Sequence, residues 1–355
     1  MLSRIGPRPS RAAAIWSLAY GAVGLFWTLG GEGYPFGPQN DPGAAISALG
    51  GVSEMVGAAA IATLGVGGAI VAAGMAWRIG RGGTRRMLLV FAWALAATLL
   101  LIVPDYRVLV AVAYAPLFLV GAPFGWPPDA NYFDVFTWPV VNQLLFIGGG
   151  LLWAATAFRY GRETSEASCV ACGRSDTSAG WTSASAAARW GRGATAVAVA
   201  VPLAYALTRW AWAFGIPLGI TDEFLRQGQE TGVWLAGAGL ATVAAAGAGL
   251  TLGLAMRWGE VFPGWIPLLG GRVVPVGLAV VPAGIVAILV TSAGLMFVRL
   301  AVTGSFGDAF ASLGPLEDNW AALVPELLWP VWGVALGAAA LAYHHRRRGR
   351  HAIRA

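Results

Sequence analysis

The sequence predicts an all-α integral membrane protein with about eight transmembrane helices, arranged as two parallel four-helix repeats. Three observations predict this fold class. Of the 355 residues, 57% are hydrophobic and only 11% are charged, whereas soluble domains carry roughly 25% charged residues. Several windows of eighteen or more apolar residues are long enough to cross a bilayer as helices. A phrase from the first half of the chain also recurs in the second half.

The apolar windows define the expected spans. Their runs are continuous and rich in Ala, Gly, Leu and Val, which disfavours a transmembrane barrel, because barrel strands alternate apolar and polar residues. The 17 Trp and 8 Tyr are typical of residues that anchor helices at the lipid–water interface. In chain order, the expected spans are 12–30, 53–77, 87–103, 136–158, 194–215, 233–256, 274–300 and 323–343.

The first span follows a basic start, as a signal peptide would. No small-residue cleavage site closes its apolar run, so we expect this helix to be retained.

The charges between the spans separate by sign. Ten acids and a single arginine, Arg226, lie in the segments 31–50, 122–135, 216–232 and 301–322. Nineteen of the 23 basic residues lie in the other connecting segments and at the two ends. Because basic loops stay in the cytoplasm, we expect a plasma-membrane protein with both termini inside the cell. The net charge of +6 is explained by the basic cytoplasmic segments of a membrane protein, so no nucleic-acid partner is expected.

The chain contains 23 arginines and no lysine, which is typical of a GC-rich, bacterial genome. The basic segments are 1–11, 78–86, 159–192, 257–272 and 344–355.

Residues 87–121 contain two apolar runs split by Pro104-Asp105-Tyr106-Arg107. Two full crossings here would reverse the charge bias of every later loop, so the bias requires an odd number of crossings. One solution is a span at 87–103, with Asp105 and Arg107 at the outer surface and a re-entrant or interfacial helix at 108–121. The other is one long kinked helix with both charges inside the bilayer.

Residues 18–37, LAYGAVGLFWTLGGEGYPFG, match residues 203–219, LAYALTRWAWAFGIPLG. A second match pairs Trp138-Pro139-Val140 with Trp329-Pro330-Val331. Four spans in each half give both halves the same orientation, and parallel repeats commonly form a solute site between them. We therefore expect a first repeat at 1–158, a cytoplasmic linker at 159–193, a second repeat at 194–343 and a basic tail at 344–355. The matched pairs are Tyr20 and Tyr205, Trp27 and Trp212, Gly30 and Gly215, Pro35 and Pro217, and Gly37 and Gly219.

Arg209 lies inside the fifth span, where the first half has Gly24. A charge deep in a bilayer costs ~2.5–3.5 kcal/mol on insertion scales, so it should face protein or water and have a partner. The candidate partners are Asp222, Glu223, Glu54 and Glu326.

Two interpretations of Arg209 are open. The guanidinium can form an ion pair that only fixes helix packing, or it can bind a ligand. An arginine flanked by aromatic side chains suits an anionic or amphipathic ligand. The ligand-binding residues predicted on this basis are Arg209, Tyr205, Trp212, Asp222 and Glu223.

Cys169 and Cys172, the only cysteines, form a C-x-x-C motif in the linker. The cytoplasm is reducing, so a structural disulfide is not expected. Two such thiolates can hold one face of a Zn²⁺ ion, with further ligands from the tail histidines His344, His345 and His351 or from a second chain. A redox dithiol and an unoccupied pair are the other interpretations. Zinc is the one cofactor that the sequence suggests.

Other patterns narrow the function. No histidine lies in an expected span, which excludes a haem held by two intramembrane histidines, and no zinc-protease or phosphate-loop motif occurs. Asn142 and Gln143 predict interhelical hydrogen bonds, and Gly249-Leu-Thr-Leu-Gly253 predicts a close helix–helix contact. The basic tail is a stop-transfer signal that can also hold anionic lipid.

The prediction that best fits these patterns is a transporter of a small anionic or amphipathic solute. The alternative is a non-transporting membrane scaffold or sensor whose cytoplasmic loop binds zinc or a partner. An enzyme is less well supported, because the outer acids lack a neighbouring base. Membrane lipids are the expected partners, together with a second copy of the chain in a homo-oligomer.

Overall fold

The computed structural model describes residues 9–124, 131–164, 180–310 and 318–351. These residues form helices and loops, with no strand beyond a single antiparallel bridge between Val261 and Val273. Six of the described helices are long and apolar enough to cross a membrane, which agrees with the predicted class of helical membrane protein. They are α2 (Glu54–Ala76), α3 (Gly82–Ala97) with the π-helical turn η2 (Thr98–Ile102), α5 (Trp138–Glu163), α6 (Ala184–Ala213), α8 (Val233–Leu252) and α9 (Val276–Thr303).

Two further long helices, α1 (Pro9–Thr28) and α12 (Trp329–His351), occupy the first and last expected spans. That all eight helices cross the membrane stays a prediction. The chain divides into two compact units, one of residues 1–108 and 133–174 and the other of residues 109–132 and 175–355. Residues 109–132 thus group with the second unit, whereas the sequence-based boundary placed them in the first repeat.

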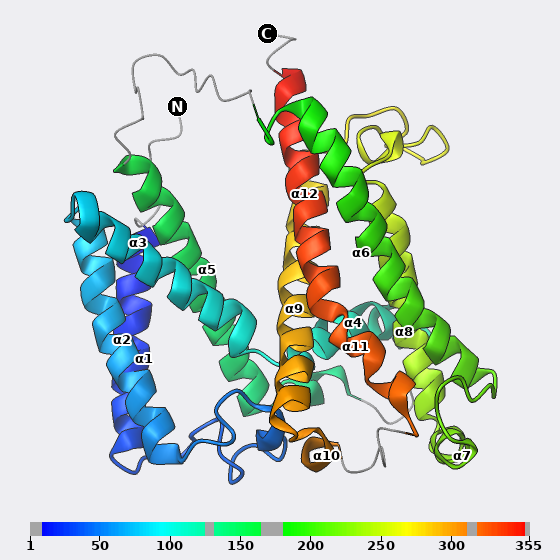
Figure 1. Cartoon of the computed structure of the whole chain (residues 1–355), viewed down its shortest axis with the longest axis horizontal. Helices are drawn as coiled ribbons and strands as arrows, with labels where there is room; N and C mark the ends of the chain where they lie inside the picture. The colour runs from blue at the N-terminus through cyan, green and yellow to red at the C-terminus, as the bar shows by residue number, and fades with distance from the viewer. Residues whose placement is uncertain (1–8, 125–130, 165–179, 311–317, 352–355) are drawn as a thin grey trace. The chain divides into compact units, whose positions relative to one another are not determined.

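In the first unit, α1 packs along α2 and also against α5, and α5 packs against α3 (Figure 1). Glycines make the contact between α1 and α2 close. A Cβ atom on Gly24 would lie 2.6 Å from the backbone nitrogen of Ala62, and one on Gly65 would lie 2.5 Å from Gly21. Small residues at such positions allow two helix backbones to approach, which is the usual basis of helix packing in membranes.

In the second unit, α6 packs against α8 and α12, and α12 packs against α9 (Figure 1). The first of the four long helices therefore contacts the second and fourth, and the fourth contacts the third, as in the first unit. The helix α4 (Tyr106–Gly121) belongs mainly to this unit, where the Tyr114 hydroxyl donates to the carbonyl of Ala236 at 3.4 Å. The short helices are α7 (Asp222–Glu230), α10 (Phe306–Ala309) and α11 (Val324–Leu327).

The repeated phrase forms a helix end in each unit. In the first unit, α1 ends at Thr28, and Gly30 takes a φ of +90°, a left-handed conformation that glycine adopts without steric cost. The Gly30 N–H donates to the carbonyl of Trp27 at 3.0 Å, and the Gly31 N–H donates to Phe26 at 3.0 Å. These bonds satisfy carbonyls that the helix end leaves free.

In the second unit, α6 ends at Ala213, and Gly215 has a φ of +82°. Its N–H donates to the carbonyl of Trp212 at 3.1 Å, and the Ile216 N–H donates to Ala211 at 2.8 Å. The donors and acceptors occupy the same positions of the phrase as in the first unit. The two matched tryptophans, Trp27 and Trp212, are both buried.

Two expectations from the sequence need correction. Helix stops at Ile102 and resumes at Tyr106, so residues 87–121 are not one long kinked helix. Asp105 is buried within the protein, with only 2% of it accessible, and its expected place at the outer membrane surface stays a prediction. The prediction of a helix contact at Gly249 and Gly253 is wrong: nothing lies within 4 Å of a Cβ on Gly249, and Gly253 makes room for the ring of Trp258.

Candidate functional site

The first candidate site surrounds Arg209 in the second unit. Tyr205 and Trp212 precede and follow it by four and three residues, spacings that place all three side chains on one face of α6. The guanidinium carbon of Arg209 lies 4.6 Å from the centre of the Tyr205 ring and 4.3 Å from that of Trp212. The cation is therefore held by two aromatic rings, a contact that strengthens when water is excluded.

Arg209 is only 8% exposed and has a buried carboxylate as its partner. Its Nη2 donates to Oε1 of Glu326, from α11, and its Nη1 donates to the carbonyl of Ala321 and to the hydroxyl of Thr208, both at 3.1 Å. Of the four candidate partners, the structure thus selects Glu326. Arg209 lies four residues before the end of α6, which at 1.5 Å per residue is about 6 Å from that end.

Two polar atoms beside this ion pair are buried and have no hydrogen-bond partner among the described residues. They are Oε2 of Glu326 and the indole Nε1 of Trp329, one acceptor and one donor. Glu326 and Trp329 are 5% and 7% exposed, and the Trp329 ring lies 5.6 Å from that of Tyr205. Buried polar groups are nearly always hydrogen-bonded, so two unpartnered ones at one ion pair require an explanation.

A loop pairing positions Ala321 and Glu326. The segment after α6 meets the segment before α11, where the Ala321 N–H donates to the carbonyl of Gly219 at 3.1 Å. The side-chain oxygen of Asn319 accepts from the N–H of Thr221 at 3.0 Å. Gly219 has a φ of +70°, and a Cβ there would lie 2.6 Å from that of Ala321. Glycine is therefore required for this approach.

The two acids that the sequence assigned to the same site lie elsewhere in the unit. Asp222 and Glu223 occupy the exposed first turn of α7, where Thr221 caps the helix. Glu223 accepts from Arg226 at 2.7 Å and from Gln227 at 3.0 Å, and these hydrogen bonds lower the pKa of its carboxyl. Carboxylates at a helix start are favoured by the helix dipole, so this arrangement serves α7 itself.

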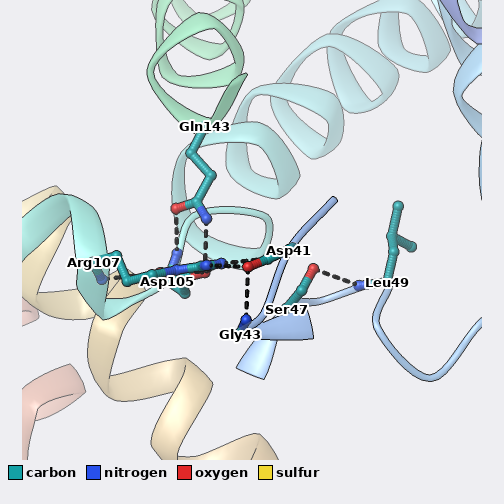
Figure 2. A network of polar contacts seen from close by, with 7 residues as sticks. All are labelled: Asp41, Gly43, Ser47, Leu49, Asp105, Arg107 and Gln143. Atoms are coloured by element: carbon teal, nitrogen blue, oxygen red, sulfur yellow. Dashed lines mark hydrogen bonds and ion pairs between the residues drawn. The ribbon is translucent and has the colours of Figure 1, made fainter. Parts of the chain in front are cut away.

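A second arginine network lies in the first unit, where Figure 2 shows Arg107, 18% of whose side chain is exposed, between two buried carboxylates. Its Nη1 and Nη2 donate to the two oxygens of Asp41 at 2.6 and 2.9 Å, a forked geometry. Its Nε and Nη2 donate to Asp105, the shortest contact being 2.6 Å. The Gln143 amide donates to Asp105 at 2.7 Å and accepts from its N–H at 3.0 Å, and the Gly43 N–H donates to Asp41 at 2.8 Å.

The Arg107 network therefore ties three segments together: the loop after α1, the break between α3 and α4, and the start of α5. Burial lowers the pKa of Arg107, but the hydrogen bonds that it donates to Asp105 and Asp41, and the charges of these carboxylates, outweigh burial and raise that pKa above its ordinary value. No side-chain N or O of the three charged residues is an unpartnered buried atom. This network is a structural clamp, in contrast to the pair at Arg209.

The second unit also contains an apolar groove of about 820 Å³. Its walls come from α8, α9, α12 and the loop between α8 and α9, and they are almost entirely apolar. Such a volume falls within the usual range of ligand pockets, ≈300–1,000 Å³. Residues that represent the four walls are Leu250, Pro282, Trp332 and Trp265.

The predicted metal ligands Cys169 and Cys172 lie outside the described residues, so the zinc prediction stays open. Among the described residues, no group of three or more His, Cys, Asp or Glu side chains is placed to hold a metal ion. In the basic tail, Arg346 and Arg347 donate to backbone carbonyls of the loop between α8 and α9.

The sequence indicated Arg209, Tyr205 and Trp212, because a charge in an apolar run stands out. The Arg107 clamp and the groove were not predicted. Asp41 and Arg107 are 66 residues apart in the sequence, and the groove needs three helices and a loop, so no local pattern indicates either. Comparison of the chain with family models, curated proteins and solved structures found no match.

Proposed function

We propose that this protein is a membrane carrier for a small anionic or amphipathic solute, with Arg209 as the group that binds the anionic part. The observation that carries the proposal is the ion pair of Arg209 and Glu326, buried between aromatic rings and flanked by an unpartnered acceptor and an unpartnered donor. Ionisable residues within membrane helices commonly mark solute pathways.

The geometry suggests how such a site can work. A solute carboxylate or phosphate matches the planar guanidinium as well as Glu326 does, so it can take the place of Oε1 at Nη2 of Arg209. The rings of Tyr205 and Trp212 remain against the cation and offer apolar surface to the rest of the solute. The Trp329 N–H and Oε2 of Glu326 supply one further donor and one further acceptor.

We also propose that the two halves arose by duplication, as carriers with parallel repeats did. Two observations support this proposal. The four long helices contact one another in the same order in each unit. The repeated phrase ends α1 and α6 with the same pair of backbone hydrogen bonds and the same left-handed glycine. After the duplication, the second half acquired Arg209 at the position where the first half has Gly24, and Gly24 packs against α2.

The test is ligand binding by the purified full-length protein. A panel of short- and medium-chain carboxylates, inorganic phosphate and alkyl sulfonates is screened by the shift of the unfolding temperature in detergent. We expect at least one of these anions to stabilise the wild type, and Arg209→Lys to lose that shift, because lysine cannot form the same forked and stacked contacts. The matched control is Arg226→Lys, an exposed arginine of the same unit.

A stabilising anion is then loaded into proteoliposomes and its exchange is measured. Equal exchange by wild type and Arg209→Lys would exclude Arg209 from the solute site. The alternative function, a scaffold or sensor with a zinc- or partner-binding loop, rests on Cys169 and Cys172, and no observation on the described residues favours it.

A further inference from the structure

The apolar groove of the second unit is bounded on one side by the loop between α8 and α9, residues 253–275. This loop is held firmly by the end of α12. The Tyr343 hydroxyl donates to the carbonyl of Gly259 at 2.6 Å. Arg347 donates to the carbonyls of Glu260 and Val274, both at 3.0 Å. Arg346 pairs with Glu260 at 3.2 Å, so the groove has a fixed wall.

The outer part of this loop exposes apolar side chains. Trp265 is 81% exposed and Leu268 is 91% exposed, which is unusual for large apolar side chains in a loop. Exposed tryptophan and leucine at the end of a transmembrane helix are typical of a segment that rests in the lipid–water interface. We therefore expect the groove to lie where lipid chains and lipid head groups meet.

The same loop carries cations that the fold does not use. Arg257 and Arg272 are exposed, and neither has an ion-pair partner among the described residues. Arg257 precedes Trp258, a groove-lining residue, and the carbonyl of Arg272 accepts from the N–H of Phe262, another one. Arg346 and Arg347 donate to carbonyls of the loop, so Arg257 and Arg272 are the exposed cations that flank groove-lining residues in sequence and backbone pairing.

We propose that the groove is a binding site for an anionic glycerophospholipid of the surrounding bilayer. An acyl chain lies between α8 and α9 on the side chains of Trp332 and Leu336, and the phosphate of the head group is held by Arg257 and Arg272. An apolar groove alone would accept any lipid chain. The two free arginines beside it select a negatively charged head group, since each adds a favourable interaction with anionic lipid. This site is separate from Arg209 and does not depend on the carrier proposal.

The test is native mass spectrometry of the purified full-length protein, mixed with phosphatidylglycerol or phosphatidylcholine of identical acyl chains. We expect a bound lipid that survives dilution, with at least a tenfold preference for phosphatidylglycerol. The double variant Arg257→Gln/Arg272→Gln should lose that preference while keeping weak binding of both lipids. Arg189→Gln/Arg192→Gln, which removes two exposed arginines from α6, is the matched control and should behave as the wild type.

A second variant tests the groove itself. Ala283→Phe fills the groove and should abolish retention of both lipids, whereas Val281→Phe, on the exposed face of the same helix, should not. Equal retention of the two lipids by the wild type would overturn the proposal. So would an unchanged preference in the double arginine variant, or a detergent adduct that phosphatidylglycerol does not displace. The arginine variant alters only exposed side chains, so its result stands even if Ala283→Phe does not fold.

Discussion

At the scale of single residues, Arg107 and Arg209 are held in different ways: Arg209 is itself buried, whereas Arg107 is partly exposed and its two carboxylate partners are buried. The guanidinium of Arg107 donates to the carboxylates of both Asp41 and Asp105, and the Gln143 amide donates to Asp105. Arg209 has one carboxylate, two rings and two unpartnered polar atoms nearby. A fully satisfied buried network rigidifies a fold, whereas an unpartnered buried donor or acceptor costs free energy that a bound ligand can recover by pairing with it.

Removing the charge of Arg209 alone should be costly. Arg209→Ala leaves Glu326 buried and unpaired, so we expect a loss of about 3–5 kcal/mol in the free energy of unfolding. The double variant Arg209→Met/Glu326→Leu should recover most of that loss, because well-packed apolar residues often replace a buried ion pair without destabilisation. Denaturant unfolding in detergent measures both. If the double variant is as unstable as the single one, the Arg209–Glu326 pair is needed for folding, and this expectation is wrong.

The Arg107 clamp gives a second expectation. Arg107→Met leaves Asp41 and Asp105 close together without a counter-charge, and it should cost about 3–5 kcal/mol of unfolding free energy. The control Arg226→Met removes an arginine from exposed pairs with Glu223 and Glu230, which should change that free energy by less than about 1 kcal/mol. Similar losses in the two variants would show that burial of the clamp does not matter.

Only part of this residue-scale picture can be read from the sequence. Arg209 is visible because it interrupts an apolar run, and Tyr205 and Trp212 follow from helical spacing. The choice of Glu326 among four acids depends on the pairing of the loops after α6 and before α11, through Gly219 and Asn319. Sequence spacing carries no information about that pairing.

At the scale of elements, glycines decide how helices end and approach. Gly215→Ala should cost roughly 1–2 kcal/mol of unfolding free energy, because a Cβ atom disfavours the left-handed conformation that ends α6. Gly219→Ala should cost more, since its Cβ would also clash with Ala321. Gly284→Ala, inside α9 with open space around it, should be neutral or stabilising. Thermal unfolding of the three variants in detergent ranks them, and any other order contradicts this assignment of roles.

The sequence is informative about elements where an apolar run is long and uninterrupted, and the long helices lie in the expected spans. It is less informative at residues 87–121, where two short runs flank Pro104. The charges Asp105 and Arg107 were placed by membrane topology alone, but their position is set by Asp41 and Gln143, which a topology argument does not include. The helix contact predicted from the Gly249–Gly253 spacing is also wrong, because Gly253 accommodates the side chain of Trp258 and not a second helix.

At the scale of the whole molecule, the sign of the loop charges predicts the orientation in the membrane. A fluorescent protein fused after Ala355 should fold and fluoresce, because the C-terminus is expected in the cytoplasm. A periplasmic reporter enzyme inserted after Gln229, in the acidic end of the second unit, should be active. The opposite pattern of the two reporters would contradict the topology that the loop charges predict.

The arrangement of helices within each unit is the part of the whole-molecule picture that no sequence pattern supplies. Hydropathy orders spans along the chain but does not say that α1 contacts α5 or that α6 contacts α12. The matched phrase suggested a duplication, and the recurring order of contacts is independent support for that proposal, because neighbour order depends on small residues such as Gly24 and Gly65 spread over several helices.

The central claim is that a solute can reach Arg209, and solvent access at this position tests it most directly. Single cysteines replace Ala206 and Ala321, both fully buried, in a chain whose Cys169 and Cys172 are changed to alanine. Membranes are labelled from each side with an impermeant maleimide, and Ser185→Cys and Gln229→Cys serve as exposed controls at the two ends of the unit. We expect both buried positions to label, at a rate that a binding anion changes. Complete protection, with the controls fully labelled, would mean that Arg209 is sealed and serves only to hold the helices together.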